Sequence, residues 1–403
     1  MAQRMSLLVV LIALVGTVGF SQGTTITVEF GFSSQTDLDS LQPAVDTCAQ
    51  ELGITITPNY AGDGPGLDNR LLLTAPAGEG ADVLIGLPND NLGNAVEGGV
   101  ALDLTPYLSE ADLADFVAPA LDAGRLVGKL FAVPLTVENV ALIRNTNLVP
   151  NAPATFDELL TAARALNTEN TRGFQFDSNN SFFSFFLLSA FGGRIFGTNP
   201  DGSLNPKDVQ IDSPPFIRGA AFIQSLVQDG TILADTDDGA AKNLFLSGAL
   251  GLWVSGPWQL ADLINSGMPF TVEAIPPFAD GNRPMPFLGV QVGFVNSFTP
   301  NPEAAANVLK CLVRGDVILS WLEATRRLPA VKSLANAEYI TASPGTQGFV
   351  AQSAFTVPFS SVAEFGCHWE RTINGLTLSN DGGNTEDIFK EQATSFRECV
   401  NSL

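Results

Sequence analysis

The stretch FLSGALGLWVSGPW at residues 245–258 is the most informative part of the chain for the fold. It is typical of a helix, a short buried strand, a turn and a second helix, with Pro257 in the first turn of the second helix. Trp258 is then placed at the carboxyl end of a strand, which is where open α/β sheets hold their ligands. A large flat side chain there can stack on a ligand, although it can equally cap the core.

Strands and helices alternate on both sides of this stretch. Apolar runs and alternating patterns predict strands at residues 25–30, 54–58, 82–85, 250–254, 270–274 and 287–295. Helical spacing predicts helices at about 38–52, after Gly66, from the capping box at 155–158, at 215–229, 238–248 and 257–265, and over most of the chain after the Asn301-Pro302 start. Such alternation predicts an α/β fold, with a parallel sheet covered on both faces.

The length and charge of the chain narrow its class. With 403 residues it is longer than one ordinary core, so we expect two lobes. It carries 42 Asp and Glu against 20 Lys and Arg, a formal charge of −22 that repels nucleic acid and anionic lipid surfaces. Its single histidine, His368, argues against a His-rich metal site. We therefore expect no nucleic acid, no metal and no cofactor, and a monomer by default.

Residues 1–23 predict a secretory signal peptide. Arg4 precedes an apolar run at residues 7–15, and small residues lead to Gly23. The run is shorter than the roughly 20 residues of a membrane span. We expect a mature chain that begins near Thr24. Because the run has no cysteine at its end, we expect a periplasmic or extracellular protein without a lipid anchor.

Export changes the expected chemistry of the four cysteines, because thiols outside the cytoplasm tend to pair. Cys48, Cys311, Cys367 and Cys399 allow three connectivities, and no CxxC motif is present. Cys367 and Cys399 lie on the last two predicted helices, which favours that pair and leaves Cys48–Cys311 as the second. Four buried thiols are the alternative.

Motifs of catalysis are weak in this chain. A GxSxG match at residues 19–23 falls in the predicted signal peptide, and the Gly-rich run at 62–66 does not complete a phosphate-binding loop. Residues 235–239 begin like a calcium loop, but Leu246 stands where the bidentate Glu is needed, so a helix start is favoured. No catalytic residue is predicted. A secreted glycosidase stays open as an alternative, since paired carboxylates need no sequence motif.

Two further segments carry candidate binding residues. Asn89, Asp90 and Asn91 follow a predicted strand in the same topological place as Trp258, although they can also be helix N-caps. The run 180–186 holds more aromatic side chains than one buried helix face needs. One or two of its rings can line a cleft, with Phe185 and Phe186 favoured for the core.

Together these features resemble the extracellular solute-binding proteins of ABC importers, in the carbohydrate-binding cluster that includes maltose-binding protein. The resemblance runs from about residue 25 to the C-terminus. It rests on the export segment, the two α/β halves, and the order of three motifs: GKLFAVP with its continuation to Pro150 (128–150), PATFDEL (153–159) and the 245–258 stretch.

The resemblance implies two lobes joined by three crossing segments, with the ligand in the cleft between them. The amino-terminal lobe is expected at 24–137 and 290–338, and the carboxyl-terminal lobe at 139–289 and 340–403. Each expected disulfide then lies within one lobe, because a bridge across the cleft would block hinge closure. The implied function is capture of a sugar and its delivery to an ABC permease in the membrane.

The resemblance also implies ligand-binding residues. Trp258 and Phe182 match stacking positions, Asp90 a carboxylate that accepts sugar hydroxyls, and Glu138 an acid at the first crossing. Asn91 adds a polar group, and Asp37 and Gln291 are weaker candidates. Several positions depart from the family pattern, which favours a different or smaller saccharide than maltodextrin. Gly86 or Leu87 stands where the family has a tryptophan, Asn91 where it has an arginine, and Asn180 where it has a glutamate. Cys367-His368 stands where the family has a Trp-Tyr pair, and the next residue, Trp369, is the candidate to replace that stacking surface.

Other solutes remain alternatives: a polyol, a glycerophosphodiester or an oligopeptide. A phosphorylated ligand would require a cation in the cleft, and only Arg326 and Arg327 offer one.

Overall fold

The computed structural model describes residues 23–32, 35–60 and 67–403. The predicted signal peptide, apart from Gly23, and the Gly-rich run at 62–66 lie outside these residues. Within the described part of the chain, no helix is long and apolar enough to cross a membrane.

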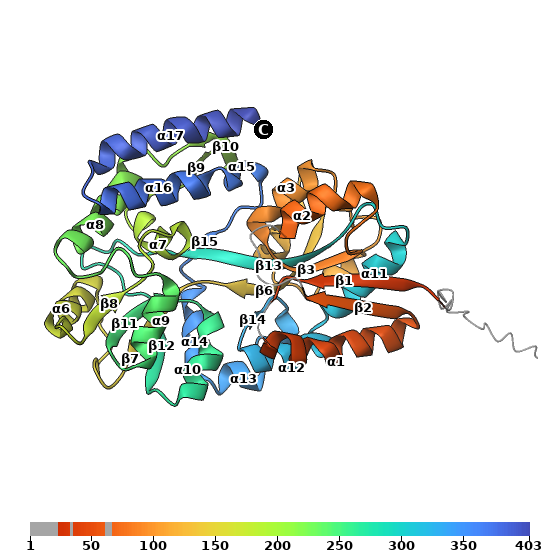
Figure 1. Cartoon of the computed structure of the whole chain (residues 1–403), viewed down its shortest axis with the longest axis horizontal. Coiled ribbons are helices and arrows are strands. Elements are labelled where there is room, and N and C mark those ends of the chain that lie inside the picture. The colour runs from red at the N-terminus through yellow and green to blue at the C-terminus, as the bar shows by residue number, and fades with distance from the viewer. Residues whose placement is uncertain (1–22, 33–34, 61–66) are drawn as a thin grey trace, which may run out of the picture.

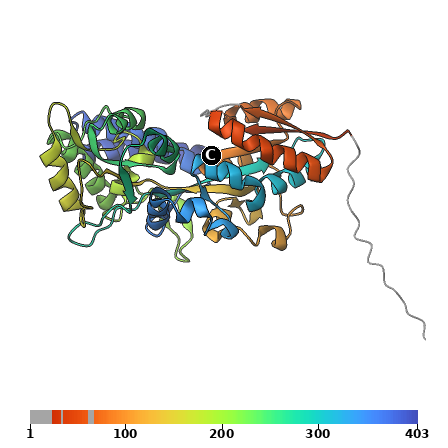
Figure 2. The ribbon, with the colours of Figure 1, turned by 90° about the horizontal axis from the view of Figure 1, so that it is seen from below.

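The molecule has two lobes, each built around its own sheet (Figure 1). They lie side by side along the long axis (Figure 2). The first sheet has the order β14-β6-β13-β3-β1-β2, with β15 paired to β13. Its strands are β1 (Thr25–Phe30), β2 (Thr55–Tyr60), β3 (Val83–Pro88), β6 (Ala132–Glu138), β13 (Phe287–Val295), β14 (Leu328–Pro329) and β15 (Val357–Pro358).

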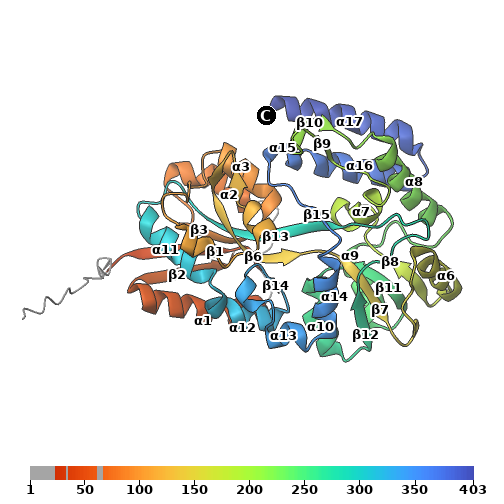
Figure 3. The ribbon, with the colours of Figure 1, turned by 180° about the vertical axis from the view of Figure 1, so that it is seen from behind.

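The second sheet has the order β12-β7-β11-β8. Its strands are β7 (Ala141–Asn145), β8 (Arg172–Gln175), β11 (Leu250–Ser255) and β12 (Phe270–Glu273). The chain passes from the first sheet to the second in the two residues between β6 and β7. Figure 3 shows β6 and β13 extending from the first sheet toward the second lobe. Two small hairpins complete the strands: β4 (Arg125–Leu126) with β5 (Lys129–Leu130), and β9 (Phe196–Thr198) with β10 (Leu204–Val209).

Both large sheets are mixed, so the prediction of a parallel sheet is wrong in part. β1 is parallel to β2 and β3, but β13 is antiparallel to β3 and to β6. In the second sheet β11 is parallel to β8 and antiparallel to β7. The physical reason is the connectivity. Parallel neighbours need a crossover within one lobe, whereas β6 leads straight into the other lobe and β13 pairs beside it in the opposite direction.

Helices cover the sheets. In and around the first sheet are α1 (Gln35–Leu52), α2 (Leu67–Thr74), α3 (Leu92–Glu97), α4 (Glu110–Leu113), α5 (Ala118–Asp122), α11 (Pro302–Leu312) and α12 (Gly315–Thr325). The others are α6 (Phe156–Leu166), α7 (Ser181–Leu188), α8 (Pro214–Gln228), α9 (Asp238–Leu246), α10 (Leu260–Ser266), α13 (Glu338–Thr341), α14 (Pro344–Gln352), α15 (Ala363–Gly366), α16 (His368–Asn380) and α17 (Thr385–Ser402). Short 3₁₀ turns occur at η1 (Ala75–Ala77), η2 (Asn89–Asn91), η3 (Pro257–Gln259) and η4 (Lys332–Leu334).

Helix starts follow the sequence signals with two differences. The Thr155 hydroxyl caps α6 by accepting from the Glu158 N–H (3.2 Å), but the Glu158 carboxylate accepts from Ala154 rather than from Thr155. The predicted capping box is therefore only half formed. Asp237 caps α9, as the helix-start interpretation of that acidic cluster predicts. α11 begins at Pro302, but the Asn301 side chain makes no capping hydrogen bond.

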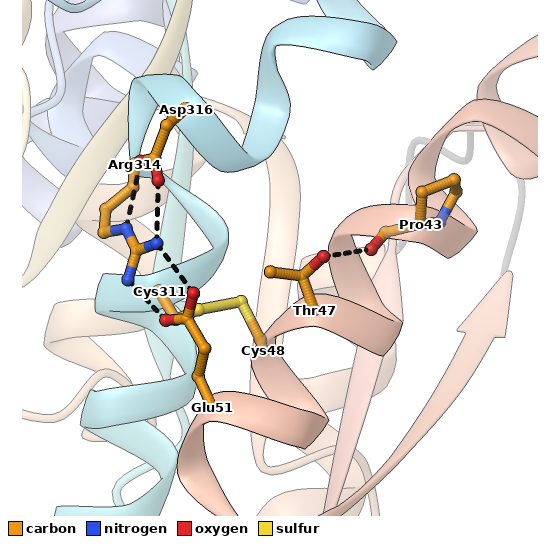
Figure 4. The surroundings of a disulfide bond; sticks show 7 residues. All are labelled: Pro43, Thr47, Cys48, Glu51, Cys311, Arg314 and Asp316. Atoms are coloured by element: carbon orange, nitrogen blue, oxygen red, sulfur yellow. Dashed lines mark hydrogen bonds and ion pairs between the residues drawn. A yellow bond between two sulfur atoms is a disulfide. The ribbon is translucent and has the colours of Figure 1, made fainter.

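Both predicted disulfides are present. Cys48 on α1 is bonded to Cys311 on α11, and Cys367 directly before α16 is bonded to Cys399 on α17. Figure 4 shows that an ion pair reinforces the first bridge: the Arg314 guanidinium holds both Glu51 oxygens, at 2.6 and 3.1 Å. The bridge and the ion pair together fasten α1 to the α11–α12 corner.

Candidate ligand-binding site

The indole of Trp258 lies over the backbone of its own turn. β11 is buried along its whole length and ends at Ser255, and Trp258 follows in η3 as a partly exposed side chain. A Cβ atom on Gly256 would lie 2.1 Å from the indole ring, so no residue larger than glycine can stand there without moving the ring. Trp258 thus stands at the end of the strand, as predicted, and the Ser255-Gly256-Pro257-Trp258 turn folds its indole back over Gly256.

A single carboxylate anchors this indole. Asp238, in the first turn of α9, accepts from Nε1 of Trp258 (3.4 Å), from Nε1 of Trp253 (3.1 Å) and from Nε2 of Gln259 (2.8 Å). Burial raises the pKa of the Asp238 carboxyl, and these hydrogen bonds oppose the rise. The sequence analysis assigned no role to Asp238, whose place next to Trp258 is set by the packing of α9 on β11.

Four aromatic side chains from separate elements form a continuous row, which we call the aromatic track. Ring centroids are 6.1 Å apart between Trp258 and Phe182, 5.7 Å between Phe182 and Phe359, and 5.8 Å between Phe359 and Trp369. Trp258, Phe182 and Trp369 are partly exposed, whereas Phe359 is buried. Phe185 and Phe186 are fully buried, which confirms their expected place in the core.

The track ends at the polar junction after β3. Nε1 of Trp369 donates to Oδ2 of Asp90 at 2.8 Å, so the last ring of the track is tied to a carboxylate of η2. Asn91 stands beside Asp90, and its amide makes a long contact of 3.4 Å with the Pro88 carbonyl. Asn91 stands at the N-cap position of α3, but its side chain makes no capping hydrogen bond there, which contradicts the alternative of a simple N-cap for this residue.

Asn89 has a different place from its two neighbours. It is fully buried, donates from Nδ2 to the Phe359 carbonyl (2.8 Å) and to Oγ of Ser361 (2.7 Å), and accepts from the Val290 N–H (3.0 Å). It therefore fixes the backbone at Phe359 against β13 and positions one ring of the track.

A second group of side chains, which we call the carboxylate network, consists of Asp37, Glu138, Gln291 and Arg327. Nη1 of Arg327 lies 2.9 Å from Oε1 of Glu138, and Nε lies 3.7 Å from Oδ1 of Asp37. Nε2 of Gln291 donates to Oε2 of Glu138 at 3.3 Å. The side chains of Asp37, Glu138 and Arg327 are only 7, 11 and 14% exposed, so the charges are held largely away from water.

The aromatic track and the carboxylate network meet across β13. Glu138 at the end of β6 pairs in register with Gly289 of β13. The position of a Cβ atom on Gly289 lies 3.6 Å from the ring of Phe182. The track therefore passes directly over the strand position opposite Glu138, and rings and carboxylates from both groups occupy one region.

All eight predicted binding residues belong to this region: Trp258, Phe182, Trp369 and Asp90 with Asn91 along the track, and Glu138, Gln291 and Asp37 in the network. Their contacts with a ligand remain a prediction. Phe359 was missed, because a phenylalanine between Pro358 and Ser360 gives no signal beyond that of a loop. Arg327 was considered only for a phosphorylated ligand.

Three of the residues that depart from the family pattern, Gly86, Leu87 and His368, leave no room for a ligand ring. Gly86 has φ +88°, and a Cβ atom there would lie 2.6 Å from the Phe32 ring. Leu87 and His368 are buried, and burial lowers the pKa of His368 to about 3. Asn180 uses its side chain to cap α7 by accepting from the Phe182 N–H. Within the described residues, no cluster of His, Cys, Asp and Glu suits a metal ion.

A separate hollow of about 640 Å³ lies beside α4 and α12 and contains none of the residues above. Its lining is largely apolar, and four of its charged groups form ion pairs, Lys310 with Asp112 (3.4 Å) and Arg314 with Asp316 (2.9 Å), while Asp115 accepts hydrogen bonds from Ser333. We assign it no ligand.

Comparisons with known proteins show the family of the chain. Residues 43–347 match the family model described as bacterial extracellular solute-binding protein. The galactooligosaccharide-binding protein of Bacillus subtilis (strain 168) is 29% identical over 312 residues, 76% of this chain and 73% of that protein. The maltotriose-binding protein of Pyrococcus abyssi is 28% identical over 304 residues, 73% of this chain and 65% of that protein.

Solved structures of similar proteins share the fold. The Thermus thermophilus maltotriose-binding protein bound with maltotriose superposes with a TM-score of 0.84 at 28% identity, covering 93% of this chain and all of that one. The maltose-maltodextrin-binding protein of Alicyclobacillus acidocaldarius gives 0.83 at 25% identity, with 93% of this chain and all of that chain covered.

Proposed function

The chain belongs to the bacterial extracellular solute-binding proteins, and from this premise we propose that it captures a sugar of the maltose or oligosaccharide type for an ABC importer. The observation that carries the proposal is the aromatic track with carboxylates at its Asp90 end and beside its middle. A sugar has C–H faces that lie against aromatic rings and hydroxyl edges that donate to carboxylates and accept from amides. One region of this chain offers both.

The proposed mechanism is closure of the two lobes on the sugar. We take residues 24–137 and 290–338 as one lobe and 139–289 and 340–403 as the other, joined by three crossings. With these bounds, Asp37 and Asp90 lie in the first lobe and Glu138 lies at the first crossing. The three rings of Trp258, Phe182 and Trp369 lie in the second lobe. A ligand that contacts both sets favours the closed form only through contacts that exist there alone. The membrane permease would read that difference.

The expected ligand is a smaller saccharide than maltodextrin, or a saccharide built from different sugar units. Two family stacking positions are lost here: Gly86 or Leu87 stands in place of a tryptophan, where the Phe32 ring fills the space beside Gly86, and the buried His368 stands in the other. Trp369 is the ring of the track that contacts Asp90. Names of similar proteins support an oligosaccharide, since they specify galactooligosaccharide and maltotriose.

We further propose that the chain is exported, that it is not anchored to lipid, and that it binds its sugar without cleaving it. The apolar segment at residues 7–15 supports export. Mass spectrometry of the secreted protein would give its mature N-terminus and reveal any attached acyl chain. Recovery of unaltered sugar from the complex is expected, and time-dependent release of product from a chromogenic glycoside would contradict it.

The test of sugar binding is a titration of intrinsic fluorescence with maltose, maltotriose, lactose and galactobiose. Replacement Trp258→Ala is expected to weaken the best ligand about 10- to 100-fold, or about 1.4–2.7 kcal/mol, because a stacked indole is lost. Phe298→Ala removes an exposed ring outside the region and serves as the control. Unchanged affinity in Trp258→Ala would remove Trp258 from the site, and no binding of any saccharide would refute the function.

A further inference from the structure

The Cys367–Cys399 disulfide lies beside one end of the aromatic track. Cys367 directly precedes α16, and Trp369, the ring of the track that contacts Asp90, is the second residue of that helix. Cys399 lies in the last turn of α17, which runs along α16 at the edge of the molecule (Figure 1 and Figure 3). The bridge therefore joins the start of one helix to the end of the other, two residues from a proposed ligand contact.

Hydrogen bonds hold the start of α16 poorly. Cys367 occupies the N-cap position, and its side chain makes no capping hydrogen bond. Nδ1 of His368 donates to the Phe365 carbonyl at 2.5 Å, one turn back along the chain. Within the described residues, however, Nε2 of His368 and Oγ1 of Thr372 are buried without a hydrogen-bond partner. An uncapped helix start and unpaired buried polar atoms both cost stability, so the disulfide supplies a tether where other polar contacts are few.

The indole of Trp369 depends on where that helix start is held. It is partly exposed, and its Nε1 donates to Asp90 at 2.8 Å, while its ring lies 5.8 Å from that of Phe359. Both partners lie outside α16, in η2 and directly after β15. A shift of the helix start by about 1 Å would lengthen the bond to Asp90 beyond the range of a good hydrogen bond. The place of the track's last ring is therefore tied to the place of Cys367.

The two disulfides of the chain differ in exposure. Cys48 and Cys311 are 0 and 4% exposed, and their bridge joins α1 to α11 (Figure 4). Cys367 is buried as well, but Cys399 is partly exposed. Thiol–disulfide exchange requires a thiolate to reach a sulfur atom. We therefore expect a dithiol to open Cys367–Cys399 first.

We propose that the Cys367–Cys399 disulfide is a positioning device for Trp369, and that its redox state regulates sugar affinity. The inference rests on the proposed function and deepens it by naming a regulation of the same site. The closed bridge holds the indole between Phe359 and Asp90. A dithiol opens the bridge by exchange: the S–S bond breaks, each cysteine gains one electron and one proton, and the dithiol becomes a disulfide. The freed helix start no longer fixes the indole, so the sugar binds more weakly.

The first experiment compares the two bridges by calorimetry. The probe is the saccharide that binds best among maltose, maltotriose, lactose and galactobiose. Replacement of both Cys367 and Cys399 by serine should weaken binding about tenfold, because the site is no longer pre-organised. The matched control is replacement of Cys48 and Cys311 by serine, which should bind as tightly as the wild-type protein. Both changes lower thermal stability, so a loss of stability alone does not distinguish the bridges.

The second experiment asks whether the effect acts through Trp369. In the wild-type protein Trp369→Ala should weaken binding about tenfold, but by less than about threefold once Cys367 and Cys399 are replaced, because the indole is no longer held there. In the Cys48 and Cys311 control, Trp369→Ala should cost as much as in the wild-type protein. A general loosening of the fold would not produce this difference.

Reduction of the wild-type protein tests the same step without any replacement. Dithiothreitol is added in stages, free thiols are alkylated, and mass spectrometry identifies the cysteines that have reacted. We expect Cys367 and Cys399 to react first and affinity to fall about tenfold as they do. Reoxidation should restore the affinity. Circular dichroism checks that each form is folded.

Three results would overturn the inference. They are full affinity in the folded protein with Cys367 and Cys399 replaced, a cost of Trp369→Ala that is the same with either bridge open, and reduction that begins at Cys48 and Cys311. If the replaced protein does not fold, the reduced wild-type protein decides. If that form also unfolds, the bridge is structural and the inference fails. A wild-type protein that binds none of the saccharides would instead refute the proposed function.

Discussion

Replacement of Asp177 by asparagine should stabilise the protein at neutral pH but not in acid. Asp177 lies two residues after β8, in the turn that leads to α7, and is half-buried. Burial raises the pKa of its carboxyl from 3.8 to about 6. Hydrogen bonds from the backbone of Asn179 and Asn180 oppose the rise, and the nearby charges of Asp238 and Asp237 add to it.

The sign and size of the effect follow from proton linkage. Between pH 3.8 and about 6 the folded protein binds more protons at Asp177 than the unfolded chain does, so stability falls as pH rises through this window. Each pH unit is worth about 1.4 kcal/mol, which gives an upper limit near 3 kcal/mol above pH 6. Because the side chain is partly exposed, solvent screening reduces the expected penalty to about 1–2 kcal/mol.

The assay is urea unfolding of wild-type and Asp177→Asn proteins at pH 4, 5, 6 and 7.5. Asparagine keeps an acceptor for the two backbone donors and cannot ionise. The variant should therefore gain about 1–2 kcal/mol at pH 7.5 and little at pH 4. Asp201→Asn, an exposed acid in the β9–β10 hairpin whose hydrogen bonds with Ser203 lower its pKa, should show no gain at neutral pH. A stability difference for Asp177→Asn that is absent, or that does not change with pH, would refute the reasoning.

Three further replacements test other parts of the structure. Asp238→Asn should weaken sugar binding about 3- to 10-fold and shift the emission of Trp258, since the indole loses a charged acceptor; identical titration and emission would contradict this. The double replacement Cys48→Ser and Cys311→Ser opens a bridge spanning 263 residues and should lower the free energy of unfolding by about 4 kcal/mol with sugar affinity unchanged, whereas an unaltered melting temperature would count against it. Gly86→Ala should cost about 2 kcal/mol or more in denaturant unfolding, because the position combines φ +88° with an aromatic ring 2.6 Å from the new Cβ; full wild-type stability would show that the ring can move.

Much of the fold was predictable because its signals are local. The predicted strand at residues 287–295 coincides with β13, and the buried strand with its Pro257 turn is β11 followed by η3. Such features depend on the spacing of apolar residues and on proline and glycine within a few positions. The direction of β13 was not predictable, because it depends on which strand of the sheet it pairs with rather than on its own residues.

The sequence alone determined the two-lobed α/β class, the disulfide pairs favoured for an exported chain, and the place of Trp258 at a strand end, where Gly256 leaves room for the indole. Only the tertiary structure decided what surrounds that indole and what neutralises the acids. Phe359 joins the aromatic track through a loop, and Arg327 meets Glu138 across 189 residues of chain. Contacts of that range are set by the packing of whole elements, and no local pattern of residue types encodes them.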